Sequence, residues 1–532
     1  MGHRIGVLLL AAGGGAVWGL CFGRETLPLA SWAALAPLLL LLGHRRAPLL
    51  GWLHGTLFWA VSISWITPTL ETYGGLPRPL ALALTAGLCA FLGLYHLAFA
   101  WLGRPLWRRG GALPLAALPA LWVALEWLRT YAVSGFPWNL AGYAWIDVPG
   151  ALPLAAWIGV FGLSYLLVLA NTGVARAVAR GRWAPAAVPL LLPLLLLPLA
   201  GRWSRSWSAD AGELSALSGA GPVARPVRIL QPNIPNLVAF DRLAVERNYR
   251  KVLAHSNAAC DPGSLLVWPE SAAWPFSYAR DPHLTRDLAA LARRGCTVLF
   301  NSVHEEGESY YNSVFLVAEG RPLVRYDKRH LVPFGEYVPL QGVFTFMDSL
   351  ARNAGDFRAA ERLVLLPWAG ERLGVAICFE VIFPAEVAEL ARAGATVLVT
   401  VTNDAWYGDT FAPWQHLRMA RFRAAETRRP MLRAAITGVS ALIAPDGSVR
   451  AQLGVYDEGV IRGTVSGRRG VTPFARRPWV VPAACTLLAV GALVAARRRR
   501  LPVLPAREDI GREAEGVGAP GGDDHPHPAD LG

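Results

Sequence analysis

Long apolar stretches separated by short polar loops dominate the first 200 residues and return near residue 480. A hydrocarbon layer about 30 Å thick takes about 20 apolar residues of helix. Seven stretches approach or reach this length before residue 201, namely 4–22, 28–43, 48–67, 79–102, 112–130, 154–175 and 184–201. The first is glycine-rich and closely followed by others, so we interpret it as a retained helix, not a cleaved signal. The pattern predicts a multi-pass α-helical membrane domain: seven transmembrane helices over 1–201 and a C-terminal one over 478–496.

Between these membrane segments, short β-branched runs alternate with helix-like stretches. Strands are predicted at 227–233, 265–269, 297–303, 312–318, 323–328, 363–367, 373–378, 396–402 and 433–443. Helices are predicted at 240–257, 283–294, 384–393 and 413–428. This alternation indicates a layered α/β domain over 226–466. The segment 501–532 is rich in Gly, Pro, Asp and Glu, and we expect a disordered cytoplasmic tail there.

Composition supports the division into an apolar and an ordinary part. The 532 residues are 53% hydrophobic and 17% charged, with a mean hydropathy of +0.34. Residues 1–200 contain only four acidic residues and twelve arginines. A wholly soluble enzyme and a disordered chain are therefore both excluded.

The arginines predict which side of the membrane each loop occupies, because short cytoplasmic loops are rich in basic residues. With the N-terminus in the cytoplasm, thirteen arginines lie on the inner side: 4, 45, 46, 104, 108, 109, 176, 180, 182 and 497–500. Only Arg24, Arg78 and Arg129 lie in the outer loops between the early helices. Seven crossings place 226–466 outside the membrane. Four further arginines (202, 205, 476 and 477) oppose the rule, but they flank a large translocated domain, where the rule is weak. The membrane thus explains the net charge of +13, and no nucleic-acid partner is expected.

Three reactive side chains stand at the ends of predicted apolar strands. Glu270 closes the strand at 265–269, Lys328 the strand at 323–328, and Cys378 the strand at 373–378. Together a carboxylate, an amine and a thiol can carry out acyl transfer. Glu270 would act as the base, Lys328 as the oxyanion stabiliser and Cys378 as the nucleophile. Only two lysines occur among 51 basic residues, so this lysine is notable.

Each of these residues also has an ordinary structural interpretation, as a core cysteine or a surface charge. Cys260 and Cys296 compete for the role of nucleophile, but neither is flanked by charged catalytic partners. The six cysteines have no paired short spacing, which argues against a zinc knuckle or a dense disulfide framework. His304, His330 and His416 lack metal-ligand spacing, so structural roles are expected for them. We expect neither a metal nor a cofactor.

Several motifs resemble the Glu-Lys-Cys signature of the nitrilase, or carbon–nitrogen hydrolase, superfamily and, within it, the apolipoprotein N-acyltransferase family. They are Trp268-Pro269-Glu270, the run Tyr326-Asp327-Lys328-Arg329-His330-Leu331-Val332-Pro333-Phe334-Gly335-Glu336-Tyr337-Val338-Pro339, Ile377-Cys378-Phe379-Glu380, Asn403-Asp404-Ala405-Trp406 and Gln415-His416. The loop from Gly135 to Tyr143 and the seven-plus-one helices extend the resemblance over almost everything but the tail. Phe379 and Pro232 depart from the family pattern, where tyrosine and glycine are usual.

The resemblance implies an αββα sandwich and a two-step reaction at the outer, periplasmic face of the bacterial plasma membrane. Cys378 would take an acyl chain from a phospholipid donor as a thioester, and the α-amine of a diacylated lipoprotein would accept it. Glu336 would hold Lys328 in place; Phe379, Glu380 and Trp406 would support or bind substrate. For Glu336 and Glu380 a purely structural ion pair remains an equal alternative.

Two other functions stay open at this point. A membrane-tethered amidase or hydrolase of the same superfamily would use water as acceptor, and a decayed domain would be a non-enzymatic scaffold. The outer loop from Val133 to Gly150 is expected to be an interfacial anchor or a substrate wall. Apolar residues Val343, Phe344 and Phe346 are predicted to form a mobile lid, so that serine replacements would lower turnover on lipids.

Overall fold

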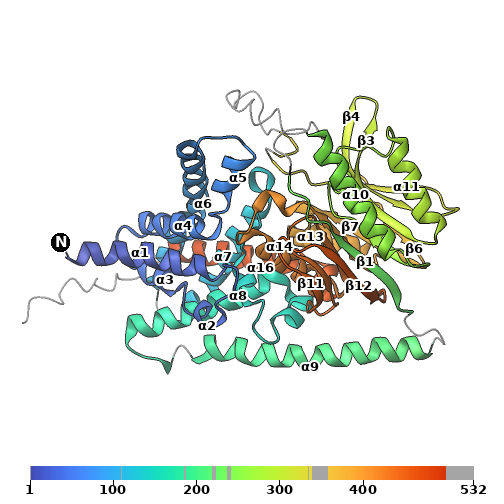
Figure 1. Ribbon diagram of the computed structural model, residues 1–532. Helices are drawn as coiled ribbons and strands as arrows, with labels where there is room; N and C mark the ends of the chain where they lie inside the picture. The colour runs from blue at the N-terminus through green and yellow to red at the C-terminus, as the bar shows by residue number, and fades with distance from the viewer. Residues whose placement is uncertain are drawn as a thin grey trace, which may run out of the picture.

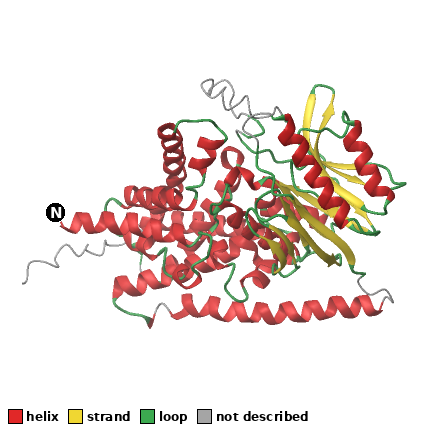
Figure 2. Cartoon of the chain, viewed as in Figure 1, coloured by secondary structure: helices red, strands yellow, loops and turns green. Residues whose placement is uncertain are grey.

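The chain forms a helical part and a part made of two sheets, which pack side by side (Figure 1). The structure is a computed structural model that describes residues 2–109, 111–184, 187–217, 223–236, 241–333, 335–337 and 357–498. Strands gather at one end of the molecule, and most of the helices lie toward the other (Figure 2). The predicted lid residues Val343, Phe344 and Phe346 and the tail 501–532 lie outside the described residues.

Each predicted membrane segment falls on helix. The helices are α1 (Gly2–Leu20), α2 (Pro28–Ser31), α3 (Ala36–Leu41), α4 (Ala47–Ser62), α5 (Ile66–Thr72), α6 (Arg78–Trp107), α7 (Leu113–Tyr131), α8 (Ala151–Arg180), α9 (Ala187–Leu217) and α16 (Val480–Arg498). The second predicted helix is interrupted, because four residues in turn conformation separate α2 from α3. The third bends by 55° between α4 and α5.

Within the described residues, α6, α8 and α16 are long and apolar enough to cross a membrane, and the bent pair α4–α5 would make a fourth. Three shorter apolar segments accompany them, over Arg4–Leu20, Pro28–Leu41 and Ala187–Arg202. Candidate membrane-spanning helices are therefore present in the helical part. The count of eight crossings, and the domain bounds built on it, stay predictions.

The second part contains two six-stranded mixed sheets. The first has the order β12-β1-β2-β3-β4-β5 and the second β11-β10-β9-β8-β7-β6. The first comprises β1 (Arg225–Gln231), β2 (Leu265–Val267), β3 (Thr297–Glu306), β4 (Ser309–Val317), β5 (Val324–Asp327) and β12 (Gly459–Val465). The second comprises β6 (Leu366–Trp368), β7 (Glu371–Ile377), β8 (Val397–Thr402), β9 (Met431–Ala435), β10 (Ser440–Ile443) and β11 (Val449–Leu453). Strands β1, β2 and β3 run parallel, as do β7, β8 and β9, so their carboxyl ends meet at one edge of each sheet.

The sheets face each other and helices cover both outer faces, which confirms the αββα sandwich. Alternation along the strands explains the layering: in β2, Leu265 and Val267 pack against the second sheet, whereas Leu266 packs outward. The helices α10 (Arg242–Ala259) and α11 (Pro282–Arg293) cover the first sheet. The helices α13 (Pro384–Arg392) and α14 (Ala412–Thr427) lie between the second sheet and the membrane helices.

One predicted strand is wrong and two strands were not predicted. The apolar run 433–443 is a hairpin of β9 and β10, because the chain turns at Thr437 and Gly438. A side chain at Gly438 would collide with Asp404, whose Cβ lies 2.5 Å from the position of an added Cβ. Strands β11 and β12 escaped prediction since neither is uniformly apolar. Residues of β11 alternate between partly buried and exposed positions, and β12 combines partly buried, exposed and buried ones.

The helical part and the sheets form one packed body through α14. The side chain of Gln415 donates from Nε2 to the carbonyl oxygens of Phe22 (2.7 Å) and Ser62 (2.8 Å). Its Oε1 accepts from the indole nitrogens of Trp138 (2.7 Å) and Trp65 (3.3 Å). The side-chain amide of Gln415 thus joins α14 to the C-terminal ends of α1 and α4, to the start of α5 and to the loop after α7. The site that follows is therefore held against the membrane part.

Candidate active site

Glu270 lies buried where the chain leaves β2. Its Oε2 accepts a hydrogen bond from the backbone amide of Asn403 (2.9 Å), which follows β8 of the other sheet. Its Oε1 accepts from Nδ2 of Asn312 (2.9 Å) and lies 3.8 Å from Nζ of Lys328. Burial raises the pKa of Glu270, with Lys328 and the two hydrogen bonds acting in the opposite direction. This carboxyl group is therefore easier to protonate than an exposed one, as proton transfer requires.

Lys328 follows β5 and is almost completely buried. Its Nζ lies 2.9 Å from Oε1 and 2.8 Å from Oε2 of Glu336, and its backbone amide donates to the carbonyl oxygen of Asn312 (2.9 Å). Burial alone would lower the pKa of Lys328, but Glu336 and Glu270 raise it above its ordinary value. The two carboxylates thus favour the charged form of the ammonium group in spite of its burial.

Cys378 begins the 3-10 turn η5 (Cys378–Ile382) directly after β7. Its φ of 51° is in the left-handed region, which non-glycine residues seldom adopt. Burial raises the pKa of the thiol, as does the charge of Glu270, whereas Lys328 and a hydrogen bond from Thr402 lower it. Glu270 and Lys328 therefore act electrostatically on the same sulfur atom, and burial favours its thiol form.

Asn312 and Glu336 tie the carboxylate to the amine. Nδ2 of Asn312 donates both to Glu270 and to Oε1 of Glu336 (2.7 Å), while Oε2 of Glu336 accepts from the amide of Val332 (2.8 Å). Sequence reasoning singled out Glu336 but missed Asn312. The available signal was an amide side chain within a predicted strand, a position where asparagine is uncommon.

A second polar network supports the turn at Cys378. The imidazole of His416 lies between Oδ1 of Asp404 (3.0 Å from Nδ1) and the carbonyl oxygen of Cys378 (3.2 Å from Nε2). Arg433 donates from Nη2 to Oδ2 of Asp404 (2.6 Å). Burial alone would raise the pKa of Asp404, but Arg433 and His416 lower it to about 2. Asp404 and Arg433 had no role assigned from the sequence.

The remaining predicted residues surround this centre. Glu380 accepts from the amide of Ile377 (2.6 Å) and from the hydroxyl of Tyr326 (2.9 Å), and burial raises its pKa to about 7. These contacts are hydrogen bonds with the protein itself, and no ion pair of Glu380 is found among the described residues. Its role stays a prediction. Phe379 is buried, with its ring 5.3 Å from that of Phe383.

Trp406 is instead partly exposed. Its ring meets that of Tyr73 edge-on at 4.8 Å, and its carbonyl oxygen accepts from the hydroxyl of Thr69 (2.9 Å). The rim of the catalytic part is thus bound to α5 of the helical part.

The loop after α7 packs against the nucleophile's surroundings. Nε2 of His330 lies 3.0 Å from the carbonyl oxygen of Ser134, and the ring of His330 stacks on Phe383 at 3.8 Å. At Gly135, whose φ is 84°, an added Cβ would meet the carbonyl oxygen of Thr130 at 2.1 Å. The first half of this loop therefore contacts the segment that follows Lys328. The interfacial-anchor and substrate-wall interpretations of the loop both stay predictions.

Cys260 and Cys296 have no free thiol with which to act as the nucleophile, because they form a disulfide with each other. The free cysteines are Cys21, Cys89, Cys378 and Cys485, and only Cys378 lies in the two-sheet part. Among the described residues no group of three or more His, Cys, Asp or Glu side chains could hold a metal ion.

Comparisons with known proteins support the class of protein that the fold indicates. Residues 227–472 match the carbon–nitrogen hydrolase family, so the two-sheet part is a domain of that class. Residues 14–173 match the apolipoprotein N-acyltransferase N-terminal domain.

Curated relatives that match nearly the whole chain identify the family within this class. The apolipoprotein N-acyltransferase of Geobacter metallireducens is 37% identical over 93% of this chain and 96% of its own. Those of Ralstonia nicotianae (89% and 90% covered) and Methylococcus capsulatus (91% and 95%) are each 35% identical. The chain belongs to the apolipoprotein N-acyltransferase family, as the motifs predicted.

Proposed function

We propose that this protein transfers a fatty acyl chain from a membrane phospholipid to the N-terminal α-amine of diacylglyceryl-cysteine lipoproteins. The observation that carries the proposal is the meeting of Glu270, Lys328 and Cys378 at the ends of three strands from two sheets. Membership of the apolipoprotein N-acyltransferase family supplies the substrate class.

In the first step, Glu270 takes the thiol proton as the sulfur of Cys378 attacks the ester carbonyl of the phospholipid. The ammonium group of Lys328 stabilises the resulting oxyanion. When the intermediate collapses, the C–O bond breaks and Glu270 returns the proton to the departing glycerol hydroxyl. The products are a thioester on Cys378 and a lysophospholipid.

In the second step, the free amine of the lipoprotein attacks the thioester carbonyl. Glu270 accepts a proton from the attacking nitrogen, Lys328 again holds the oxyanion, and the C–S bond breaks. The thiolate takes the proton back from Glu270, so the enzyme returns to its starting state. The first product leaves before the acceptor reacts, which makes the mechanism ping-pong.

The raised pKa of Cys378 supports a base-assisted attack. A thiol that stays protonated at neutral pH is a weak nucleophile until a neighbouring base removes the proton. Glu336 and Asn312 support the step by positioning, since they hold Lys328 and Glu270 at fixed separation.

We propose further that the catalytic domain lies on the outer, periplasmic face of the bacterial inner membrane. The arginine distribution favours this orientation, and the disulfide of Cys260 and Cys296 is independent support. Disulfides persist in oxidising compartments such as the periplasm and are rare in the cytosol. Lipid substrates would then enter from the outer leaflet.

The reaction is tested by offering a phospholipid and a synthetic diacylated lipopeptide to the purified full-length protein and weighing the product. A mass gain of one acyl chain on the amine is expected, with an acyl-protein intermediate when the lipopeptide is withheld. Cys378→Ala should abolish both, whereas Cys485→Ala, at another buried free cysteine, should not. Release of free fatty acid without N-acylated peptide would instead establish the hydrolase, and no acyl-protein at all would leave a scaffold.

A further inference from the structure

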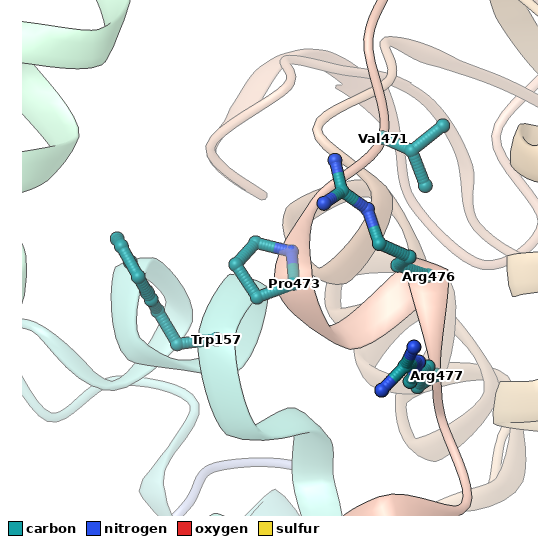
Figure 3. A pocket seen from close by; sticks show the side chains of 5 residues that line it. All are labelled: Trp157, Val471, Pro473, Arg476 and Arg477. Carbon is teal, nitrogen blue, oxygen red and sulfur yellow. The ribbon is translucent and has the colours of Figure 1, made fainter.

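A pocket of about 450 Å³ opens at the junction of the helical part and the catalytic domain, apart from the candidate active site. It is lined by Trp157, Val471, Pro473, Arg476 and Arg477. Figure 3 shows Trp157 on one side of the opening and the two arginines on the other, with Pro473 between them. Trp157 is near the beginning of α8, and the arginines immediately precede α16.

The backbone that carries the two arginines is firmly held. Arg476 is the last residue of the short helix α15 (Pro473–Arg476), and Arg477 follows it. The side chain of Thr472, which precedes α15, accepts a hydrogen bond from the amide of Ala475 (3.0 Å) and donates one to the carbonyl oxygen of Glu426 (2.6 Å). Arg392, at the end of α13, donates to the carbonyl oxygen of Ala475 (2.7 Å). The backbone positions of the arginines are therefore fixed, so that binding has to order only their side chains.

Both arginines are exposed, and neither forms an ion pair or side-chain hydrogen bond with another residue that the structure describes. They also oppose the arginine distribution, because they lie on the side of α16 opposite to Arg497. Trp479 and Val480 beside them are 58% and 41% exposed. Two unpaired cations therefore adjoin an apolar, aromatic surface where a candidate membrane helix begins, which is the chemistry of a lipid head group and its first acyl carbons.

The pocket is separated from Cys378 by the length of α13. That helix begins at Pro384, just after η5, and ends at Arg392, which contacts α15. Nine helical residues extend about 13 Å. A lipid in the pocket is accordingly not placed to give up its acyl chain to Cys378.

We propose that this pocket binds the phosphate group of an anionic phospholipid of the outer leaflet, which fixes the catalytic domain against the membrane surface. The guanidinium groups of Arg476 and Arg477 hold the phosphate oxygens, since this planar group can donate two parallel hydrogen bonds. Trp157, Pro473 and Val471 contact the glycerol and upper acyl carbons. The inference rests on the membrane placement in the proposed function but not on the chemistry at Cys378.

The test uses full-length protein in mild detergent, titrated with dioleoylphosphatidylglycerol and followed by native mass spectrometry. We expect one lipid to bind more tightly than the rest, and the Arg476→Gln/Arg477→Gln variant to lose about tenfold or more of that affinity. Arg242→Gln/Arg247→Gln is the matched control, because it removes two exposed arginines from α10, which covers the other sheet. Should the glutamine pair not fold, the Arg476→Lys/Arg477→Lys pair keeps the charge but loses bidentate binding, and weaker retention is again expected.

Further experiments test whether a ligand other than an anionic phospholipid occupies the pocket. Millimolar inorganic phosphate and dioleoylglycerol should neither bind there nor displace the lipid. Equal loss in the control variant, undiminished binding in the pocket variant, displacement by inorganic phosphate, or displacement by the diacylated lipopeptide would each overturn the proposal. Cys378→Ala protein should bind the lipid as the wild type does. Lipid binding without acyl transfer by the wild type would thus contradict the proposed function alone, and acyl transfer without specific lipid binding the pocket alone.

Discussion

Lys328 keeps a charge in the interior because two carboxylates face it. Its side chain is 1% exposed, and those of Glu270 and Glu336 are 9% and 11% exposed. Breaking such a buried pair typically costs about 3–5 kcal/mol, since one charge is left without a partner. Lys251, the other lysine, meets Glu458 at the surface with its side chain 33% exposed. Burial and a second facing carboxylate thus distinguish the candidate catalytic lysine from the ordinary one.

The fall in the reaction rate toward acidic pH should follow the protonation of Glu270. This carboxyl group must be ionised to accept the thiol proton, and burial raises its pKa above the ordinary 4.5. Alkylation of Cys378 by iodoacetamide should therefore slow as pH falls, with a midpoint above 4.5. Peptide mass spectrometry at a series of pH values measures the rate.

The matched variants for this profile are Glu270→Gln and Glu458→Gln. The first should be slower by about a hundredfold or more near neutral pH and lose the acidic midpoint, because no base remains. The second changes a surface carboxylate and should retain the wild-type profile. A midpoint that survives in Glu270→Gln would assign the titration to another group.

His416 is expected to act as a positioning residue, because it contacts the backbone of Cys378 and not the sulfur. His416→Ala should lower kcat by about tenfold with little change in KM, since the left-handed turn loses a contact to its carbonyl oxygen. His416→Gln can still donate to that oxygen and should recover part of the rate. Equal losses in both variants, with lowered thermal stability, would indicate a purely structural role.

At the scale of single residues, some members of the candidate site could be predicted from the sequence and others could not. Glu270, Lys328 and Cys378 were found because each closes an apolar strand and belongs to a motif. Asp404 also lies in a motif, but its partners Arg433 and His416 come from two later elements. Nothing local to Arg433 indicates that its charge ends on Asp404, because the pairing exists only after the strands assemble.

At the scale of elements, parallel pairing explains why Cys378 lies at the same sheet edge as Asn403, whose amide donates to Glu270. In β7 and β8, Ile377 pairs with Val401, so the residues that follow, Cys378 and the Asn403 turn, lie at the same edge. Periodicity predicted most of these strands because their buried faces are continuous. It could not divide 433–443 into two strands, since the residues at the hairpin are as buried as the strands themselves.

The break in α8 at Gly159 should be required for stability. Its φ of 64° opens the helix, and an added Cβ would meet the ring of Phe474 at 2.4 Å. Gly159→Ala should destabilise the protein by about 2 kcal/mol or more through backbone strain and displacement of that ring. The thermal unfolding midpoint of the purified chain measures this.

Gly87→Ala in α6 is the control for that substitution. No atom lies within 4 Å of a Cβ added at Gly87, and alanine is the better helix former. This variant should be as stable as the wild type or slightly more so. If both alanine variants melted alike, the break at Gly159 would not have the structural role assigned to it.

At the scale of the whole molecule, the disulfide should stabilise the catalytic domain. Cys260 and Cys296 are 36 residues apart, and the chain-entropy relation gives about 4 kcal/mol for a loop of this size. The Cys260→Ala/Cys296→Ala variant should accordingly melt at a lower temperature than the wild type. Protein made by export should show only four alkylatable thiols after unfolding without reductant.

Cys485→Ala controls for the loss of a buried cysteine without a crosslink and should melt close to the wild type. Six alkylatable thiols in the exported, unreduced protein would contradict the disulfide and remove one support for the periplasmic placement.

The amino-acid sequence by itself determined the division into an apolar helical part and a layered α/β part, the choice of Glu270, Lys328 and Cys378 as candidate catalytic residues, and the family. These properties are local: periodicity, strand ends and short motifs lie within neighbouring residues. Tertiary structure alone decided that Asn312 joins Glu270 to Glu336, that Cys260 pairs with Cys296, and that Gln415 joins the two parts. Each of these contacts joins segments far apart in the chain, so it has no local pattern and depends on the packing of the two sheets and the helices around them.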